Sequence, residues 1–412
     1  MKIINAFKRQ KRKTGLINTF IYVIGSGIHK LVIALFKRLV LPFCRMDENK
    51  ILFTSSPDFS DNSKILYEYI CCNKPKYICR WIVGENKGSY SDKTVFVEGR
   101  SKYHSGYTMR ALKEIAASKY IFFTHSSPVY ELGKRKGQIV INLWHGCGYK
   151  NRTSNVPWIS KNPFDYVLVP GPVFIDAKSR FFGCSSEQVL PIGYPRYDLF
   201  YKESKEAVDF ADVLKQGNQK LVLWMPTYRK TISGIFDVEK IEGYFELPIL
   251  KSEEELERLN AFCKQQQIML CIKRHPQQIK YQCEDMKLSN VVFLSNEDFD
   301  KNNTEIYSFL QYINGLITDY SSIAIDYILL DKPMAFTLND MEDYRDAQGF
   351  VFDDPLTYMP GHHLYNYDDV ISFLTDIQTN KDIYRSNRTE IFKEVHNTCE
   401  NYCKRICDHF EL

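Results

Sequence analysis

The sequence predicts an α/β protein whose two successive halves each form a parallel sheet. From residue 46 onward, short apolar runs of strand length alternate with stretches of helical spacing, which is the pattern of parallel α/β folds. A polar segment, 201–220, interrupts this alternation, which then begins again. The 412 residues also exceed one ordinary hydrophobic core, so we expect about two domains.

The first half, 46–200, begins the alternation of strands and helices. In 62–72, for example, the apolar residues recur with the spacing of one helix face. The predicted strands are 50–56, 77–83, 94–97, 120–124, 139–144 and 166–169, and the predicted helices are 62–72 and 106–118.

The second half, 201–412, repeats the pattern and ends in a tail, 382–410, that is predicted to be largely helical. The predicted strands are 221–225, 268–273, 291–294, 315–318 and 333–337, and the predicted helices are 252–266 and 321–330. Two such halves in succession predict two Rossmann-like domains that face a cleft. Open α/β sheets bind ligands at the carboxyl ends of their strands.

Residues 1–45 form a separate segment in which a basic head precedes helical apolar patches. The head contains Lys8, Arg9, Lys11, Arg12 and Lys13. The longest uncharged run, 14–28, is shorter than the roughly 18–20 residues that span a bilayer, and no secretory cleavage site is evident. We therefore expect a helical segment lying in the interface of an anionic membrane. A transmembrane helix and a helix packed on the domain remain the alternatives.

Composition excludes several classes of protein. The formal net charge of +4 is too small for a nucleic-acid-binding protein, which usually has a strongly basic patch. The 12 cysteines include no CxxC pair, which argues against a zinc ribbon and favours reduced thiols in a cytoplasm. We therefore expect neither a metal site nor a nucleic-acid partner.

The first candidate site follows the predicted strand 139–144. His145 and Gly146 begin a His-Gly-Cys-Gly sequence, and Lys150 follows it. Glycines allow a tight turn and close approach of a ligand, and a histidine at a strand end can act as a general base near pH 7. A structural histidine beside a turn is the alternative interpretation.

Two basic clusters follow strands of the second half. Arg229 and Lys230 come after the strand 221–225, and Lys273, Arg274 and His275 end the strand 268–273. Cationic side chains at these positions are suited to bind phosphate, and arginine can do so with two hydrogen bonds. A solvated basic loop and a surface turn are the alternatives.

A fourth cluster, Thr-Asp-Tyr-Ser-Ser at 318–322, connects a strand to a helix. Asp319 or a following serine is expected to cap this helix, whose free N–H groups favour an anion. The alternative interpretation of this cluster is an ordinary capped helix.

The four clusters together are suited to a diphosphate held by the second half and a base presented by the first. The remaining histidines are interpreted as structural: His104, His125, His362, His363, His396 and His409.

These clusters, in this order, resemble the CDP-glycerol glycerophosphotransferase family of teichoic acid synthesis, which includes primases and polymerases. The family patterns WHG-T-P-x-K, A-P-T-x-R, K-x-H-P and T-D-Y-S-S-x-x-x-D appear here as WHGCGYK, MPTYR, KRHP and TDYSSIAID. Supporting matches lie at 61–64, 193–198 and 331–349. The resemblance covers roughly residues 50–400.

The resemblance implies a GT-B-like fold, with 46–200 as the acceptor domain and 201–412 as the donor-binding domain. It also implies a metal-free, cofactor-free transfer of a polyol phosphate. The donor would be CDP-glycerol or another CDP-polyol, the acceptor a lipid-linked saccharide or polymer, and the leaving group CMP. The implied catalytic residues are His145, as the base, and His275. The residues implied to bind the donor diphosphate are Arg229, Lys273, Arg274, Thr318, Ser321 and Ser322, and the orienting residues are Asp319, Asp326, Gly146 and Lys150. The enzyme would work as a peripheral protein at the cytoplasmic face of the plasma membrane.

Cys147 and Gly148 stand where the family commonly has Thr-Pro, so CDP-ribitol remains an alternative donor. A nucleotide-sugar glycosyltransferase or epimerase of GT-B fold is a second alternative. A membrane-bound assembly scaffold without activity is a third, and retention of His145 and His275 argues against it.

Overall fold

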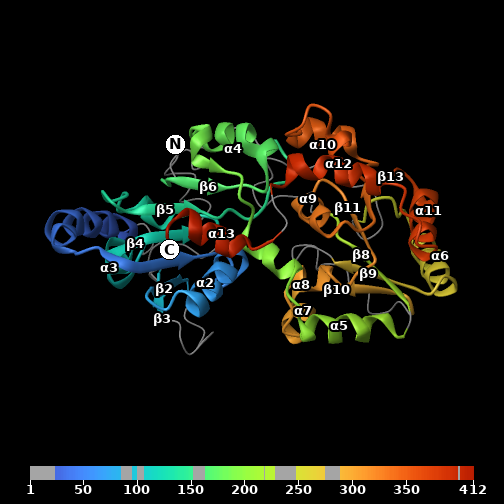
Figure 1. Ribbon diagram of the computed structural model, residues 1–412, viewed down its shortest axis with the longest axis horizontal. Coiled ribbons are helices and arrows are strands. Elements are labelled where there is room, and N and C mark those ends of the chain that lie inside the picture. Colours follow the sequence, from blue (N-terminus) through green and yellow to red (C-terminus); the bar gives the residue numbers. More distant parts are fainter. Residues whose placement is uncertain are drawn as a thin grey trace.

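The computed structural model describes residues 24–84, 95–99, 106–151, 163–217, 219–227, 247–273, 288–397 and 400–412. Within these ranges the chain forms two parallel sheets that lie side by side, each covered by helices (Figure 1). This arrangement confirms the predicted α/β class. The predicted strands agree with the observed ones to within a few residues.

The first sheet contains seven strands among the described residues, in the order β3-β2-β1-β4-β5-β6-β7. All neighbours are parallel. The strands are β1 (Asp47–Thr54), β2 (Ile78–Val83), β3 (Val95–Glu98), β4 (Ser118–Phe123), β5 (Ile139–Asn142), β6 (Tyr166–Leu168) and β7 (Val189–Leu190). The strand order reverses between β1 and β4, and such a reversal is where doubly wound sheets bind ligands.

The second sheet repeats this topology with six strands in the described ranges, in the order β10-β9-β8-β11-β12-β13. The strands are β8 (Lys220–Trp224), β9 (Ile268–Lys273), β10 (Val291–Leu294), β11 (Gly315–Thr318), β12 (Met334–Thr337) and β13 (His362–Leu364). Here the order reverses between β8 and β11. The carboxyl ends of these two strands lead into Thr227 and Asp319.

Helices cover both sheets. In the first half they are α2 (Asp61–Asn73), α3 (Met109–Ala117) and α4 (Ile175–Phe182); in the second half they are α5 (Lys205–Lys215), α6 (Glu253–Gln265), α7 (Asn296–Lys301), α8 (Ile306–Leu310), α9 (Ser322–Tyr327), α10 (Met341–Gln348), α11 (Tyr367–Gln378), α12 (Arg385–Val395) and α13 (Tyr402–His409). N-cap residues in the local sequence fix where several of these helices begin. Ser252, for example, caps α6 by accepting a hydrogen bond from the Glu255 amide. The polar segment 201–220 contains α5, which Ser204 caps in the same way.

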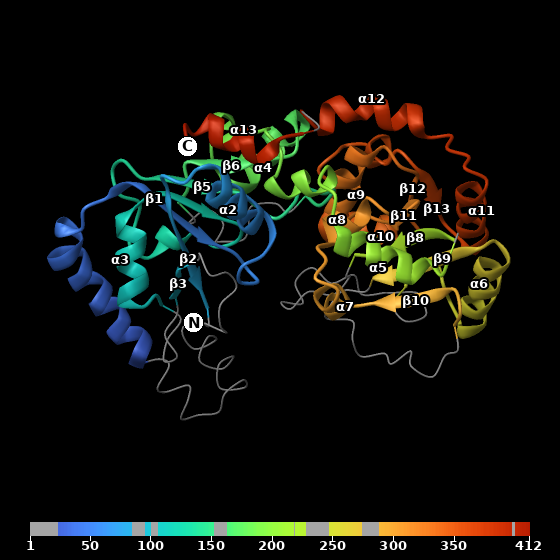
Figure 2. The same cartoon turned by 60° about the horizontal axis from the view of Figure 1, so that its bottom comes forward.

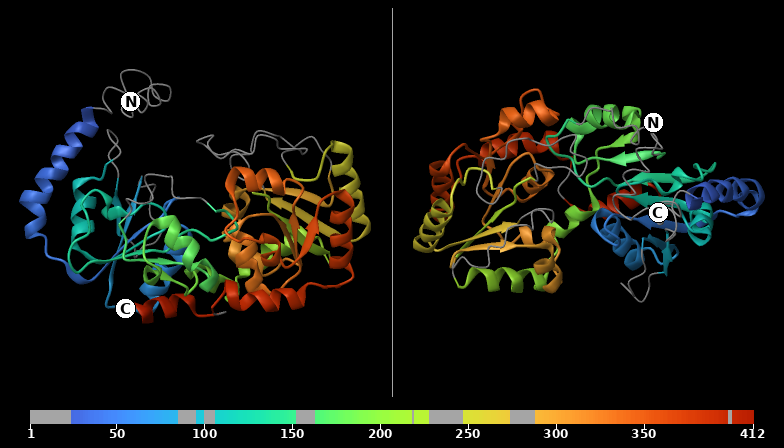
Figure 3. Two further views of the ribbon diagram at one scale, coloured as in Figure 1. Left: turned by 90° about the horizontal axis from the view of Figure 1, so that it is seen from above. Right: turned by 180° about the vertical axis from the view of Figure 1, so that it is seen from behind.

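The last helix crosses back to the first half. Figures 2 and 3 show α12 beside the second sheet and α13 against the first. The Asp198 carboxylate accepts hydrogen bonds of 2.7 and 2.9 Å from the backbone amides of Tyr402 and Cys403, at the start of α13. The Lys74 ammonium reaches the terminal Leu412 carbonyl at 2.7 Å. The end of the chain therefore ties the two halves together.

The described part of the N-terminal segment is helical from residue 24 to 35 and continues through a π-turn (Phe36–Val40) and a 3₁₀-turn (Leu41–Phe43). Phe36 is buried in the cluster that contains Leu112 and Ile115 of α3. The opposite face is apolar and exposed, through Ile24, Ile28, Leu31, Leu35 and Leu39. No helix in the described ranges is long and apolar enough to cross a membrane. The basic head lies outside those ranges.

Candidate functional site

His145 occupies the turn that follows β5. The Asn142 side chain accepts a hydrogen bond from the Trp144 amide at 2.9 Å, and Trp144 takes a left-handed backbone conformation, with φ of 54°. The His145 ring lies against the Trp144 ring, with centroids 3.9 Å apart, and against the His125 ring at 4.4 Å. Its Nδ1 lies 3.3 Å from the Thr124 carbonyl oxygen. The imidazole is thus held between two aromatic rings.

This setting keeps His145 neutral. Desolvation lowers its pKa below the ordinary value, and the neighbouring His125, Lys178 and Arg196 add to this shift, while the Thr124 carbonyl opposes it. His145 is nonetheless a solvent-exposed residue, so only the direction of this pKa shift enters the interpretation. A neutral, partly accessible imidazole is the form that can take a proton from an approaching hydroxyl.

The loop after His145 touches the start of α9. A β-carbon added at Gly146 would lie 2.7 Å from the Ser322 hydroxyl oxygen, and one added at Gly148 would lie 2.8 Å from the Ser322 amide nitrogen. Gly146 also has φ of 132°, a conformation that favours glycine. The structure therefore brings His145, Ser321 and Ser322 into one neighbourhood, although they belong to different halves of the chain.

Ser321, not Asp319, is the N-cap residue of α9, one of the two positions expected for the cap. Asp319 instead accepts hydrogen bonds from the Thr227 amide, at 2.7 Å, and from the Thr227 hydroxyl. The Thr318 hydroxyl donates to the Met225 carbonyl at 2.8 Å. Thr318 and Asp319 thus hold the segment after β8, which leads toward Arg229.

The basic residues predicted to bind the donor diphosphate are not all described by the structure. The Lys273 ammonium donates to the Asn296 side chain at 2.6 Å and lies over the Phe299 ring, and burial lowers its pKa. These contacts tie Lys273 to α7 and not to the loop of His145. Arg229, Arg274 and His275 lie outside the described residues, as does Lys230, so their predicted roles stay predictions.

A second junction joins the halves beside the first. Lys150 forms an isolated antiparallel bridge with Phe350, and the Val351 amide donates to the Tyr149 carbonyl at 2.7 Å. The Tyr149 hydroxyl donates to the Tyr358 carbonyl at 2.6 Å. Lys150 itself is exposed, and its backbone forms part of the junction.

Asp326 lies at the centre of a buried network that the sequence indicated only in part. Its carboxylate accepts a 2.8 Å hydrogen bond from Arg196 and further bonds from the hydroxyls of Tyr197 and Tyr307. Burial raises the pKa of Asp326, and these donors act in the opposite direction by stabilising the carboxylate. Arg196 also donates to Asp61 at 2.9 Å and to the His145 carbonyl at 3.1 Å.

Sequence reasoning misses Arg196 and His125 as members of this site. Arg196 lies in the Gly-Tyr-Pro-Arg-Tyr-Asp match at 193–198, but the sequence alone gives it no role. His125 is interpreted from sequence as structural, yet it follows the end of β4 much as His145 follows β5. Its position at a strand end is the signal that could have identified it. Among the described residues, no group of His, Cys, Asp and Glu side chains could hold a metal ion.

Comparison with known proteins finds similarity to proteins of teichoic acid synthesis. The model of the CDP-glycerol:poly(glycerophosphate) glycerophosphotransferase family matches residues 35–408. The chain is 26% identical over 347 residues to teichoic acid ribitol-phosphate polymerase TarK of Staphylococcus aureus, an alignment that covers 79% of this chain and 61% of TarK. It is 26% identical over 292 residues to the teichoic acid glycerol-phosphate primase of Bacillus subtilis, covering 66% of this chain and 67% of the primase.

The fold is also that of a solved relative. The wall teichoic acid polymerase TagF superposes with a TM-score of 0.72 at 18% identity, covering 96% of each chain, and a TagF structure soaked with CDPG gives 0.72 at 19%. Both halves of this chain therefore have counterparts in TagF. The match of one family model to most of the sequence shows that this chain belongs to the CDP-glycerol:poly(glycerophosphate) glycerophosphotransferase family.

Proposed function

We propose that this protein transfers a polyol phosphate, with glycerol phosphate as the first candidate, from a CDP-linked donor to a growing cell-envelope polymer. Family membership supports the reaction class. The relatives named above act in teichoic acid synthesis, as primase or polymerase. Because this chain spans only 61% of TarK, its own substrates and acceptor form part of the proposal.

The observation that carries the proposal is the contact between the His145 loop and the start of α9. His145 presents a neutral imidazole, and Gly146 and Gly148 allow Ser322 to approach closely. The base His145 comes from the first half, and the hydroxyl and amide donors of Ser322 come from the second half. They thus meet at one place. We propose that a cleft between two Rossmann-like domains, 46–200 and 201–412, opens at this contact.

In the proposed step, an acceptor hydroxyl attacks the donor phosphorus that carries the polyol. A new P–O bond forms to the acceptor oxygen, and the bond from that phosphorus to the oxygen of CMP breaks. His145 takes the hydroxyl proton, and CMP leaves with the electron pair and the extra negative charge. Phosphoryl transfer depends mainly on positioning and on neutralising this charge. We assign that task to His275, Arg229, Arg274, Ser321 and Ser322, with no metal or cofactor. Thr318 is buried and donates to the Met225 carbonyl, and Lys273 contacts α7, so we propose a supporting role for these two.

We further propose that the N-terminal segment holds the enzyme against an anionic membrane, at the cytoplasmic face of the plasma membrane. The exposed apolar face of 24–39 supports this proposal, as do the basic residues of the head. Apolar side chains in the interface and cations near anionic headgroups both favour binding. The acceptor would then be lipid-linked and reached from the surface.

CDP-ribitol is the second candidate donor, because TarK is a ribitol-phosphate polymerase. The test is CMP release from CDP-glycerol, CDP-ribitol and a panel of UDP- and GDP-sugars, each with a synthetic lipid-linked glycerol-phosphate acceptor. Acceptor-dependent CMP release with one CDP-polyol supports the proposal and identifies the donor. Turnover of a nucleotide sugar, with none of any CDP-polyol, would replace it with a glycosyltransferase or epimerase.

A further inference from the structure

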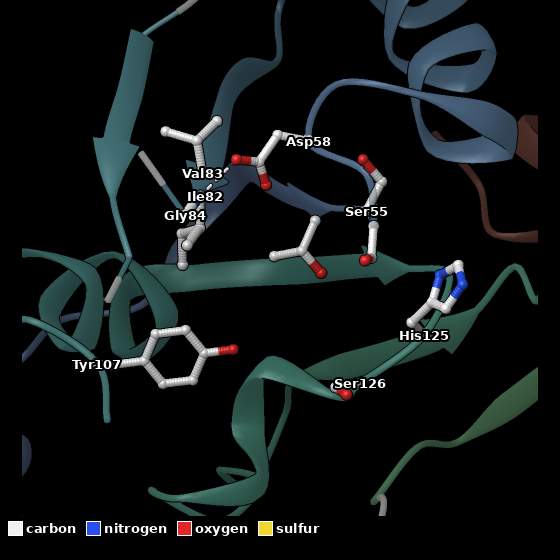
Figure 4. Close-up of a pocket in the computed structure, with 10 residues that line it drawn as sticks. Ser55, Asp58, Ile82, Val83, Gly84, Tyr107, His125 and Ser126 are labelled. Atoms are coloured by element: carbon white, nitrogen blue, oxygen red, sulfur yellow. Dashed lines mark hydrogen bonds between the residues drawn. The ribbon is translucent and has the colours of Figure 1, made fainter. Parts of the chain in front are cut away.

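A cavity of about 320 Å³ lies at the carboxyl ends of β2, β1 and β4, which are neighbours in the first sheet. The residues of its wall that matter here are Thr54, Ser55, Asp58, Tyr107, His125 and Ser126. Figure 4 shows Tyr107 on one side, with its hydroxyl directed inward, and His125 and Ser126 on the other. The volume is within the usual range of small-ligand sites.

The cavity adjoins the proposed base. His125 lines it and stacks on His145, with ring centroids 4.4 Å apart. His125 Nδ1 is paired with the Thr124 hydroxyl at 2.9 Å, and its Nε2 has no hydrogen-bond partner among the described residues. His145 itself is not among the residues that line the cavity, so a ligand there would contact His125, whose ring stacks on that of His145.

The wall carries hydroxyl groups and one carboxylate. Among the described residues of the wall, Asp58 bears the formal negative charge and no lysine or arginine contributes. Burial lowers the pKa of His125, an effect that Asp61 opposes, so the imidazole is neutral at pH 7. One Asp58 oxygen accepts the Gly84 amide at 2.7 Å. The hydroxyl groups and the carboxylate that the described residues place in this wall match a ligand rich in hydroxyl groups.

We infer that this cavity binds the terminal polyol unit of the acceptor polymer, with Asp58 accepting a hydrogen bond from one of its hydroxyls. The inference rests on the proposed function, since it assigns the acceptor end to the first half and the charged donor to the second. It also gives His125 a positioning role. Stacked on His145 and lining the cavity, His125 orients the bound polyol unit and the base relative to each other.

Two substitutions test the cavity. Ser126→Phe places a large ring in the cavity from an exposed position, so the fold should persist. Asp58→Asn keeps the side-chain size and an oxygen for the Gly84 amide but removes the charge. Ser386→Phe, at an exposed position on α12, is the matched control for the added ring. Each variant is compared with the wild type in CMP release, with donor and acceptor varied separately.

We expect the acceptor KM to rise about tenfold in Asp58→Asn, because a hydrogen bond to a charged group is lost, and to rise further in Ser126→Phe. The donor KM should stay within about twofold, and Ser386→Phe should match the wild type. An unchanged acceptor KM in both variants, or a rise confined to the donor KM, would overturn the inference while leaving the proposed function intact.

Binding without turnover separates the two proposals. A lipid-free glycerol-phosphate trimer is titrated into wild type, Ser126→Phe and Ser386→Phe, and binding is followed by NMR. Weaker binding to Ser126→Phe alone supports the cavity even if the wild type releases no CMP from any CDP-polyol, an outcome that would contradict only the proposed reaction. Equal binding to all three proteins contradicts the cavity.

Discussion

Arg196 of the first half donates a 2.8 Å hydrogen bond to Asp326 of the second half, from a position 130 residues earlier in the chain. Both side chains are buried. The same guanidinium contacts Asp61 and the His145 carbonyl. One side chain therefore connects the loop of the proposed base to the helix that begins at Ser322.

Removal of Arg196 should destabilise the protein and disturb the site together. Arg196→Ala leaves Asp326 buried without its charged partner, which costs about 3–5 kcal/mol in the free energy of unfolding. Urea denaturation measures this change. In the double variant with Asp326→Ala, the loss should be smaller than the sum of the two single losses. A strictly additive pair would contradict the proposed coupling between the halves.

Gly148→Ala should lower kcat and also weaken the contact between the two halves. The added methyl group would lie 2.8 Å from the Ser322 amide nitrogen and 3.0 Å from its Cα, so the His145 loop and α9 must move apart. We expect kcat to fall at least about tenfold, since small misplacements of reacting groups have large kinetic effects. Gly27→Ala, which meets nothing within 4 Å, is the control. Equal kcat in both variants would show that this contact does not position the base.

His145→Ala should abolish transfer while donor binding survives. The imidazole would accept the hydroxyl proton, whereas we assign the diphosphate to groups of the second half. Isothermal titration with the CDP-polyol donor and a CMP-release assay measure the two properties on one preparation. His409→Ala, an exposed histidine on α13, provides the control. Near-normal turnover by His145→Ala would rule out its role as the base.

The pH dependence of kcat/KM should show an acid limb below the ordinary histidine range. Desolvation lowers the pKa of His145, so the active neutral form persists as pH falls to 6 and is lost only when pH passes below the shifted pKa. His125→Asn reduces both the burial of His145 and the charge repulsion from its neighbour. The acid limb of this variant should therefore move to higher pH. An acid limb at or above pH 6.5 in the wild type would contradict the burial argument.

The exposed apolar face of the N-terminal helix should govern membrane binding. The triple substitution Ile28→Glu, Leu31→Glu and Leu35→Glu removes apolar side chains that are 48–62% exposed. Binding to vesicles of phosphatidylglycerol and phosphatidylcholine should weaken by at least about 100-fold, given about 1.5–3 kcal/mol for each buried side chain. Turnover of a soluble acceptor analogue should be unchanged. Val213→Glu, at an exposed apolar position on α5, is the control, and equal vesicle binding by both variants would remove the membrane proposal.

Local sequence patterns determined most of the strands and helices of this protein. Alternating strands and helices follow from apolar periodicity and chain length, so β1, β4, β8 and β11 could be predicted within a few residues. Parallel strands also place their carboxyl ends along one edge of a sheet. For that reason the polar clusters at His145 and at 318–322 could be recognised as candidate sites from the order of residues along the chain.

Only the tertiary structure decided which of these clusters meet. The contact of Gly148 with Ser322, the bridge from Arg196 to Asp326 and the stacking of His125 on His145 all join segments distant in the chain. Each depends on how two sheets, or two neighbouring strands, are placed relative to one another. Hydrophobic periodicity specifies which face of an element is buried but not which partner covers it. The sequence alone therefore determined the elements and the chemistry at their ends, and packing between the halves decided how those ends combine into a site.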